Sequence, residues 1–255
     1  MLIDDVLDFL FPRFCVLCDK RLSVQEKHIC LPCYLHLPRT NYHTVEHSVM
    51  ERFFWGKDDK IHIQHAVAFF RYKESNKEIL MQLKYKQNPD IGTYMASQFA
   101  KEILSDGSTF FEDIDVIVPI PIHWMRRLKR SYNQSDYIAQ GVSEVTGIPV
   151  CTNAVKRVVN NTSQTRMQHD ERLKNTEGIF RLVRPELLQG KHILVVDDVT
   201  TTGATISSCA EEIAKAGNIK LSVLTIAIAG QTTSETGDAE MLPYVTISPE
   251  SISKL

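Results

Sequence analysis

Residues 192–205 constrain the fold of this chain more than any other segment. An apolar run ends in two adjacent aspartates, Asp197 and Asp198, and a loop of small hydroxyl residues with one glycine leads into an amphipathic segment. This order predicts a buried parallel strand, a loop and the N-terminus of a helix. Loop amides and hydroxyls at a helix N-terminus can hold a phosphate, and two carboxylates can accept hydrogen bonds from sugar hydroxyls. The segment therefore predicts a sugar-phosphate site.

The same segment resembles the signature of the type I phosphoribosyltransferases, which bind phosphoribosyl pyrophosphate (PRPP). The resemblance implies that Asp197 and Asp198 contact the ribose hydroxyls. The residues that it assigns to the 5′-phosphate are Thr201, Thr202, Gly203, Ala204 and Thr205. A helix-capping aspartate or a Thr-Gly turn is common on its own. The full order of strand, acidic pair, loop and helix is much more specific.

Four of the six cysteines form two Cys-x2-Cys pairs that are separated by eleven residues. Each pair can turn two thiolates toward one ion, and two pairs complete the tetrahedral thiolate site of zinc. The predicted ligands are Cys15, Cys18, Cys30 and Cys33. Because four cysteines close the coordination shell to substrate, we expect a structural role. A disulfide framework is the competing interpretation, and the lack of a secretory signal argues against it.

The composition is that of a globular protein, with 43% hydrophobic residues and a formal net charge of −2. This charge gives no argument for nucleic-acid binding, although basic residues outnumber acidic ones between residues 126 and 174. No apolar run approaches the roughly 20 residues that span a bilayer. The first ten residues carry three aspartates and no basic residue, unlike a signal peptide. We therefore expect a cytoplasmic protein without membrane insertion, which begins with a short amphipathic helix.

Three segments of different character follow one another along the chain. Residues 1–38 predict a zinc-binding module with the short N-terminal helix, residues 39–60 a connector, and residues 61–255 a phosphoribosyltransferase-like domain. In the last segment strand patterns alternate with helix patterns, as in a parallel sheet covered on both faces. The expected fold is α/β: a type I phosphoribosyltransferase-like parallel sheet with helices on both faces, plus a small N-terminal zinc-ribbon module.

Strands are expected at residues 66–72, 116–122, near 150, at 192–196 and 221–229, and helices at 75–86, 92–104, 133–145 and 205–216. Ligands of such sheets bind beyond the carboxyl ends of the strands. A second strand end, after residue 122, carries a basic loop. The residues there that could hold a pyrophosphate are His123, Arg126, Arg127 and Arg130. A solvated charged surface is the simpler interpretation of such a run.

Further segments resemble the ComF competence family, which includes GntX-like proteins. They are the Val-Pro-Ile-Pro-Ile-His run that ends at His123, the Arg-Ser-Tyr-Asn-Gln block that ends at Gln134, and the cysteine pairs. Ser131 stands where the family usually has glycine, so a positive φ would strain this serine. The resemblance covers nearly the whole chain. It implies a phosphoribosyltransferase domain with an N-terminal zinc finger, in a family associated with handling single-stranded DNA during natural transformation.

Two functions follow from these resemblances. As an enzyme, the protein would transfer phosphoribosyl from PRPP to an acceptor that the sequence does not reveal, with Mg²⁺ neutralising the pyrophosphate that leaves. A polar stretch with Gln164, Arg166 and Arg172 would close over the site. Lys84 is a weaker candidate, because exposed helical lysines are common. Alternatively, the protein senses PRPP or a nucleotide and binds single-stranded DNA or a competence-machinery protein, with Tyr132 among the aromatics that could stack on bases.

Overall fold

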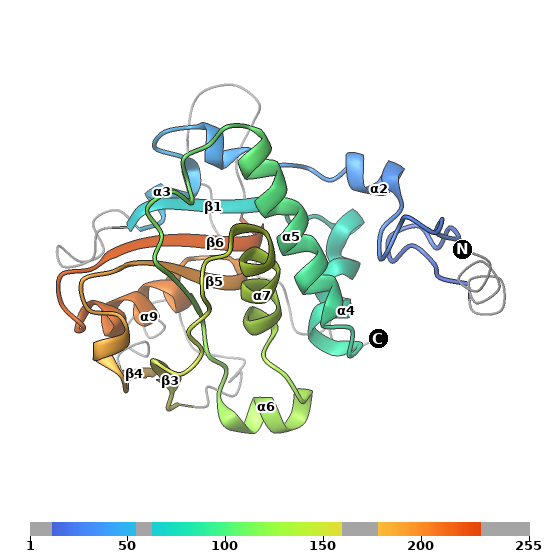
Figure 1. The fold of residues 1–255 in the computed structure, drawn as a ribbon. Coiled ribbons are helices and arrows are strands. Elements are labelled where there is room, and N and C mark those ends of the chain that lie inside the picture. The colour runs from blue at the N-terminus through green and yellow to red at the C-terminus, as the bar shows by residue number, and fades with distance from the viewer. Residues whose placement is uncertain (1–11, 55–62, 160–177, 231–255) are drawn as a thin grey trace.

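A four-stranded parallel sheet forms the centre of the molecule (Figure 1). The computed structural model describes residues 12–54, 63–159 and 178–230. The strands lie in the order β1-β6-β5-β2. Their bounds are β1 (Ile63–Arg71), β2 (Val116–Pro119), β5 (His192–Thr200) and β6 (Lys220–Ile228). The strand expected near residue 150 is a single parallel bridge between Val150 and Ile117, at the outer side of β2.

The two inner strands are buried along nearly their whole length because helices cover both faces of the sheet. Val195 of β5 pairs with Val223 of β6 on one side and with Val118 of β2 on the other. All three of these side chains are at most 1% exposed. This continuous core holds the carboxyl ends of β2 and β5 side by side at one edge of the sheet.

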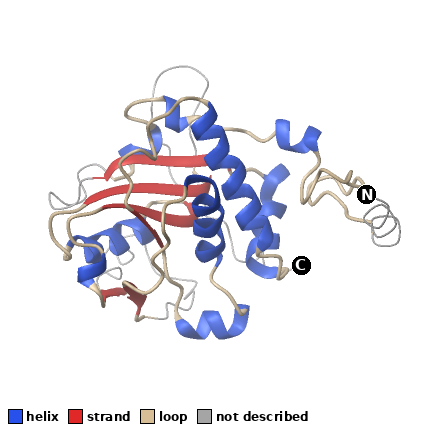
Figure 2. Ribbon diagram, viewed as in Figure 1, coloured by secondary structure: helices blue, strands red, loops and turns tan. Residues whose placement is uncertain are grey.

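The longer helices are α4 (Lys77–Tyr85), α5 (Asp90–Ser105), α7 (Gln134–Thr146) and α9 (Ala204–Ala214). α5, α7 and α9 pack on the sheet, and α4 packs against α5 (Figure 2). α5 and α7 cross one face together, and Gly141 makes their close approach feasible, since a Cβ there would lie 2.2 Å from the carbonyl oxygen of Thr93. The right-handed connection from β5 to β6 places α9 on the opposite face.

Smaller elements complete the described chain. η1 (Tyr42–Thr44) and α3 (Val49–Arg52) pack along β1, and Met50 of α3 is fully buried. η2 (Glu74–Asn76) leads into α4, and η3 (Pro185–Leu187) precedes β5. α6 (Trp124–Arg130) follows β2, and an antiparallel hairpin of β3 (Val155–Arg157) and β4 (Phe180–Leu182) lies beside α9.

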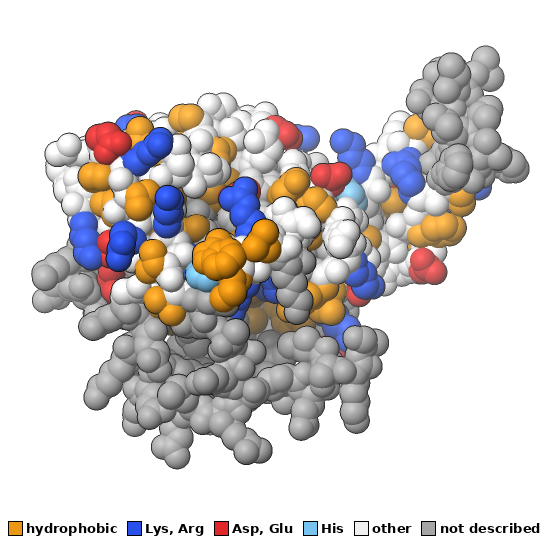
Figure 3. All heavy atoms as spheres, turned by 90° about the horizontal axis from the view of Figure 1, so that it is seen from below, with side chains coloured by type: hydrophobic (Ala, Val, Ile, Leu, Met, Phe, Trp, Pro, Cys, Tyr) orange, Lys and Arg blue, Asp and Glu red, His pale blue; other side chains and the backbone are white. Residues whose placement is uncertain are grey.

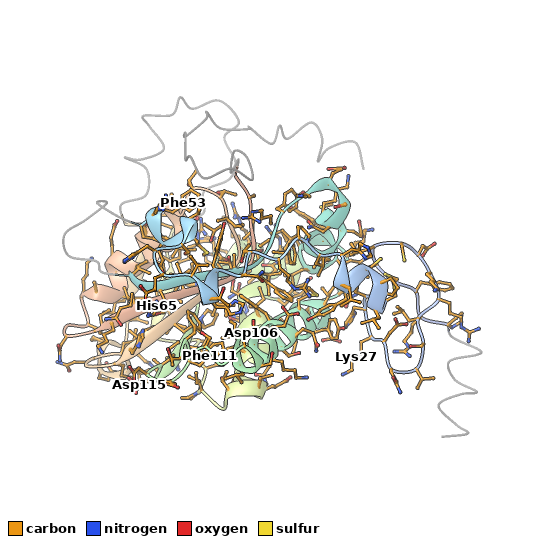
Figure 4. All side chains as sticks on the ribbon, turned by 90° about the horizontal axis from the view of Figure 1, so that it is seen from above. Lys27, Phe53, His65, Asp106, Phe111 and Asp115 are labelled. Atoms are coloured by element: carbon orange, nitrogen blue, oxygen red, sulfur yellow. The ribbon has the colours of Figure 1, made fainter. Side chains whose placement is uncertain are left out.

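The cysteine-rich module lies at one end of the molecule, where Figure 4 labels Lys27, and ends in α2 (Leu31–Leu35). Arg39 joins it to the sheet domain. Its guanidinium lies between the rings of Tyr34 and Phe69, 4.4 Å from each centroid. It also donates two hydrogen bonds to the Glu102 carboxylate, at 2.9 and 2.8 Å, and the Tyr34 hydroxyl donates to the same carboxylate. Charge-assisted bonds and ring contacts thus couple module and domain.

The structure confirms the α/β fold class and corrects several local expectations. The segment after β2 forms helix α6 where we expected a loop, and the β3–β4 hairpin was not predicted. Cys151 lies outside the named strands, and Cys209 is buried in α9. The predicted N-terminal helix lies outside the described residues. In the described part of the chain, no helix has the length and apolarity needed to cross a membrane.

Candidate functional site

The acidic pair lies within β5 rather than after it. The strand continues to Thr200 because β6 pairs with it beyond the aspartates, with Asp197 opposite Thr225. Asp198 is only 9% exposed, and Asp197 is half-buried. Strand pairing therefore fixes the backbone of both residues at the edge where β2 and β5 end.

Two side chains from helices reach the acidic pair. The Ser135 hydroxyl, at the start of α7, donates to Asp197 Oδ1 over 3.1 Å, and the N–H of Asp198 donates to the same oxygen over 2.9 Å. Lys84 Nζ, from α4, lies 3.1 Å from Asp198 Oδ1. Burial, and then the negative charge of Asp198, raise the pKa of Asp197 to about 7, although Lys84 and the hydrogen bonds oppose this shift.

The predicted phosphate loop joins β5 to the N-terminus of α9. Gly203 is the N-cap and has a φ of +72°, which glycine adopts without strain. The N–H of Ala204 donates to Thr202 Oγ1 over 3.4 Å, and Thr201, Thr202 and Thr205 are exposed. The first turn of α9 contains no acidic residue. The positive end of this helix therefore meets no carboxylate from its own first turn.

His123 caps the helix that follows β2. Its ring Nδ1 accepts a hydrogen bond of 3.3 Å from the N–H of Met125, and the residue is 5% exposed. The predicted pyrophosphate residue thus uses one ring nitrogen to begin α6. Asn133 holds the other end of the segment, because its side-chain amide donates to the carbonyl of Ile120 over 3.1 Å.

The three predicted pyrophosphate arginines divide between two sides of α6. Arg126 and Arg130 are one turn apart, and the Arg130 guanidinium lies 5.0 Å from the Tyr85 ring of α4. Burial, and then the charge of Arg130, lower the pKa of Arg126. Arg127 instead lines an open hollow, whose other lining residues are Trp124, Leu128 and Ser131. The structure brings together Arg126 and Arg130 and separates Arg127 from them.

The outer side of α6 is apolar and basic. Trp124, Met125 and Leu128 are 62%, 44% and 74% exposed. Seen from below, hydrophobic side chains gather at the centre of this face beside Lys and Arg side chains (Figure 3). Ser131 ends the helix with a φ of +67°, so the position where the resembled family usually has glycine does adopt the left-handed region.

Three side chains near the acidic pair were not assigned to it from the sequence. Lys84 is 22% exposed and paired, which corrects the expectation of an exposed lysine. Ser135 follows the Arg-Ser-Tyr-Asn-Gln block directly, and this position was its only signal. Arg157 lies in β3; burial and the charge of Arg126 lower its pKa, while Asp197 acts in the opposite direction. No local sequence pattern predicted that Arg157 lies near the acidic pair, because its position depends on an unpredicted hairpin.

The polar stretch that was expected to close over the site, with Gln164, Arg166 and Arg172, lies outside the described residues. β3 and β4 precede and follow this stretch in the sequence, pair with each other, and pack beside α9 through β4. Its role in the site stays a prediction.

The four predicted metal ligands come together in the N-terminal module. The sulfur atoms of Cys15, Cys18, Cys30 and Cys33 all lie within 4.8 Å of one another, and those of Cys18 and Cys30 are 3.6 Å apart. A tetrahedral zinc ion with bonds of about 2.3 Å separates its sulfurs by about 3.8 Å. The N–H of Cys30 donates to Cys15 Sγ over 3.4 Å, as outer groups do to metal-bound thiolates. The four residues could bind a metal ion such as zinc.

Comparison with known proteins identifies the relatives of this chain. It is 30% identical over 155 residues to the DNA utilization protein YhgH of Salmonella typhimurium, covering 60% of this chain and 67% of that protein. The chain belongs to the ComF family of competence proteins. It is also 32% identical over 116 residues to competence protein F of Haemophilus influenzae, covering 45% of this chain and 51% of that protein. Competence protein ComFC of Bacillus subtilis is 27% identical over 165 residues, with shares of 63% and 64%.

Solved structures of phosphoribosyltransferases also resemble this ComF-family chain. An adenine phosphoribosyltransferase matches with a TM-score of 0.36 and 15% identity, over 56% of this chain and 72% of that chain. The allosteric regulatory enzyme of purine biosynthesis matches with a TM-score of 0.35 and 19% identity, over 56% of this chain and 29% of that chain. No protein-family model matches the sequence.

Proposed function

We propose that this chain binds PRPP at the end of β5 and transfers its phosphoribosyl group to an acceptor, in a protein that serves DNA uptake. One arrangement carries the proposal: Asp197 and Asp198 lie near the carboxyl end of the buried strand β5, and Gly203 begins a helix whose first turn has no acidic residue. The names of the relatives, DNA utilization protein and competence protein, support the biological setting.

In this proposal each part of the site has one task. Asp197 and Asp198 accept hydrogen bonds from the ribose hydroxyls, and the amides of residues 201–205 hold the 5′-phosphate. Arg126 and Arg130 hold the pyrophosphate. The bond between C1 and the pyrophosphate oxygen breaks and leaves its electron pair on pyrophosphate, while the acceptor's lone pair bonds to C1 and the acceptor loses a proton. Fixed carboxylates stabilise the positive charge that develops on the ribose.

Two metal ions belong to the proposal. Mg²⁺ bound to ribose and pyrophosphate oxygens would neutralise the leaving group. Zinc would hold the N-terminal module through its four thiolates. Cobalt(II) substitution tests the zinc site, because tetrahedral thiolate coordination gives visible absorption bands. Cys15→Ser should weaken these bands, and equal bands in both proteins would contradict the assignment.

Calorimetry with PRPP, with and without Mg²⁺, tests the sugar-phosphate site. Asp197→Asn should abolish or strongly weaken the binding. Asp115→Asn is the matched control, because the Asp115 carboxylate accepts the N–H of His192 over 2.8 Å at the opposite end of β5. Lack of PRPP binding by the folded wild type would contradict the proposal. Acceptor-dependent release of pyrophosphate would then separate an enzyme from a sensor.

The outer side of α6 favours a second function, the binding of single-stranded DNA. Exposed Trp124 can stack on a base, and exposed Arg127 beside it can contact phosphate. Oligothymidylate binding should weaken steeply with salt and fall about tenfold or more in Trp124→Ala, since one stacked base contributes about 1–3 kcal/mol. Equal affinity of this variant and the wild type would exclude α6 from the DNA contact.

A further inference from the structure

Lys84 turns from the last turn of α4 into the sugar-phosphate site. Its ammonium lies 3.1 Å from Asp198 Oδ1, and its side chain is 22% exposed. Lysine side chains at the end of a helix ordinarily extend into water. Here the ammonium is withdrawn from water and paired with one of two adjacent carboxylates, which indicates a role connected with that pair.

The backbone on both sides of Lys84 is held in place. The hydroxyl of Tyr132, in the segment after α6, donates to the carbonyl of Leu83 over 2.6 Å, and Leu83 itself is 1% exposed. On the other side, the Tyr85 ring lies against the guanidinium of Arg130. The chain thus positions this lysine through contacts with the segment that carries the predicted pyrophosphate residues.

Charged and titratable groups from several elements surround the acidic pair. They are Lys84 from α4, Arg157 from β3 and Cys209 from α9, and Arg126 from α6 acts on Arg157 in turn. Burial opposes the charged form of Lys84, but Asp198 and Asp197 raise its pKa above the ordinary value, so the ammonium stays charged. For Asp197 the raising effects on the pKa are the larger ones, since burial and the charge of Asp198 favour its protonated form near neutral pH.

We propose that Lys84 is a positioning residue of this site, whose ammonium favours the ionised form of both carboxylates so that each can accept a ribose hydroxyl. A carboxylate accepts hydrogen bonds at both oxygens, whereas a protonated carboxyl presents a donor to the hydroxyl and loses acceptor capacity. The role rests on the proposed function, because the hydroxyls belong to the bound sugar phosphate. It deepens that function by linking ligand affinity to pH through a residue outside both sequence signatures.

Ribose 5-phosphate is the first probe, because it carries the ribose hydroxyls and no pyrophosphate. At each pH between about 6 and 9, its affinity is compared among the wild type, Lys84→Met, Lys84→Arg and Lys86→Met. Lys86 is the control, because it pairs with Glu78 at 2.6 Å and is 54% exposed. We expect Lys84→Met to bind about fivefold more weakly near pH 7 and to regain affinity near pH 9. This corresponds to a rise of about one pH unit in the titration midpoint of Asp197. Lys84→Arg and Lys86→Met should follow the wild type.

Carboxylate carbon NMR on the ligand-free protein, with Asp197→Asn to assign the signal, measures the same titration without any ligand. The midpoint of Asp197 should rise in Lys84→Met. An unchanged midpoint, or a loss of ribose 5-phosphate affinity that is equal at every pH, would overturn the proposal. If the wild type binds neither ribose 5-phosphate nor PRPP, the proposed function fails, and the carboxylate midpoint still decides whether Lys84 controls the acidic pair.

Discussion

The ends of β5 and β2 lie beside each other at one edge of the sheet, yet they are built in different ways. At β5 the strand ladder continues past the acidic pair to Thr200, and the chain turns at Gly203 directly into α9. At β2 the ladder stops at Pro119, and the chain enters a seven-residue helix whose Trp124 and Leu128 are largely exposed. The β5 end is fixed by its pairing with β6, and the β2 end presents a surface.

The two strand ends also differ in the kind of strain that they carry. At β5 the strain is electrostatic, because two neighbouring carboxylates are withdrawn from water and Asp197 is held with a raised pKa. At β2 the strain lies in the backbone, where a serine occupies a left-handed conformation. Buried charge of this kind is typical of functional sites, whereas a strained turn can be relieved without changing the chemistry.

The largest expected effect comes from neutralising the buried charge at β5. The pKa of the Asp197 carboxyl is raised from 3.8 in the unfolded chain to about 7 in the folded protein. The folded protein therefore loses stability as the pH rises through this range. Asp197→Asn should therefore be more stable than the wild type by up to about 4 kcal/mol near pH 8, and the gain should vanish near pH 4. Urea unfolding at both pH values measures it. A variant that is less stable at both would show that the charge is not strained.

The next effect concerns the turn into α9. Gly203→Ala should lower stability by about 1 kcal/mol and weaken PRPP binding about tenfold, because the new Cβ strains the turn that orients the phosphate amides. Gly190→Ala is the matched control: Gly190 has the same φ of +72°, with nothing within 4 Å of an added Cβ. We expect a similar loss of stability there and unchanged binding. Equal losses of PRPP affinity in both variants would contradict the assignment of this loop to phosphate binding.

The sequence predicted the β5 end better than the β2 end because its determinants are local. A continuous apolar run, an acidic pair and a glycine turn identify strand, ligand groups and helix start within fourteen residues, 192–205. Even here the strand was predicted to end at residue 196 and continues to Thr200, because β6 supplies ladder partners that the segment itself does not reveal.

Residues brought to the site by tertiary contacts were missed. Lys84 looks like an ordinary helical lysine until Tyr132 anchors its helix to the segment after β2. Arg157 depends on a hairpin of two three-residue strands, which is too short for a period-two pattern. The division of the arginines depends on α6 being helical, which a basic run alone does not indicate.

That division provides the third prediction. Arg126→Ala should weaken pyrophosphate binding about tenfold, because its half-buried side chain lies close enough to interact with Arg157, which in turn interacts with Asp197. Arg127→Ala removes the same charge from the exposed side and should change the affinity less than about twofold. Titration with pyrophosphate and Mg²⁺ measures both variants. Equal losses of affinity would mean that pyrophosphate binding depends on the net charge of α6 rather than on the position of each arginine. α6 would then present one continuous basic surface.

The smallest effect should come from relieving the backbone strain at β2. Ser131→Gly removes a Cβ from a left-handed residue with a φ of +67°, while it makes the unfolded chain more flexible. The first change outweighs the second by about 0.5 kcal/mol, so a small rise in melting temperature is expected, with unchanged pyrophosphate affinity. Ser131→Ala keeps the Cβ and should give no gain. An equal gain in stability in Ser131→Ala would show that the strain comes from the serine hydroxyl. The β2 end would then resemble the β5 end, where polar groups rather than the backbone lower the stability.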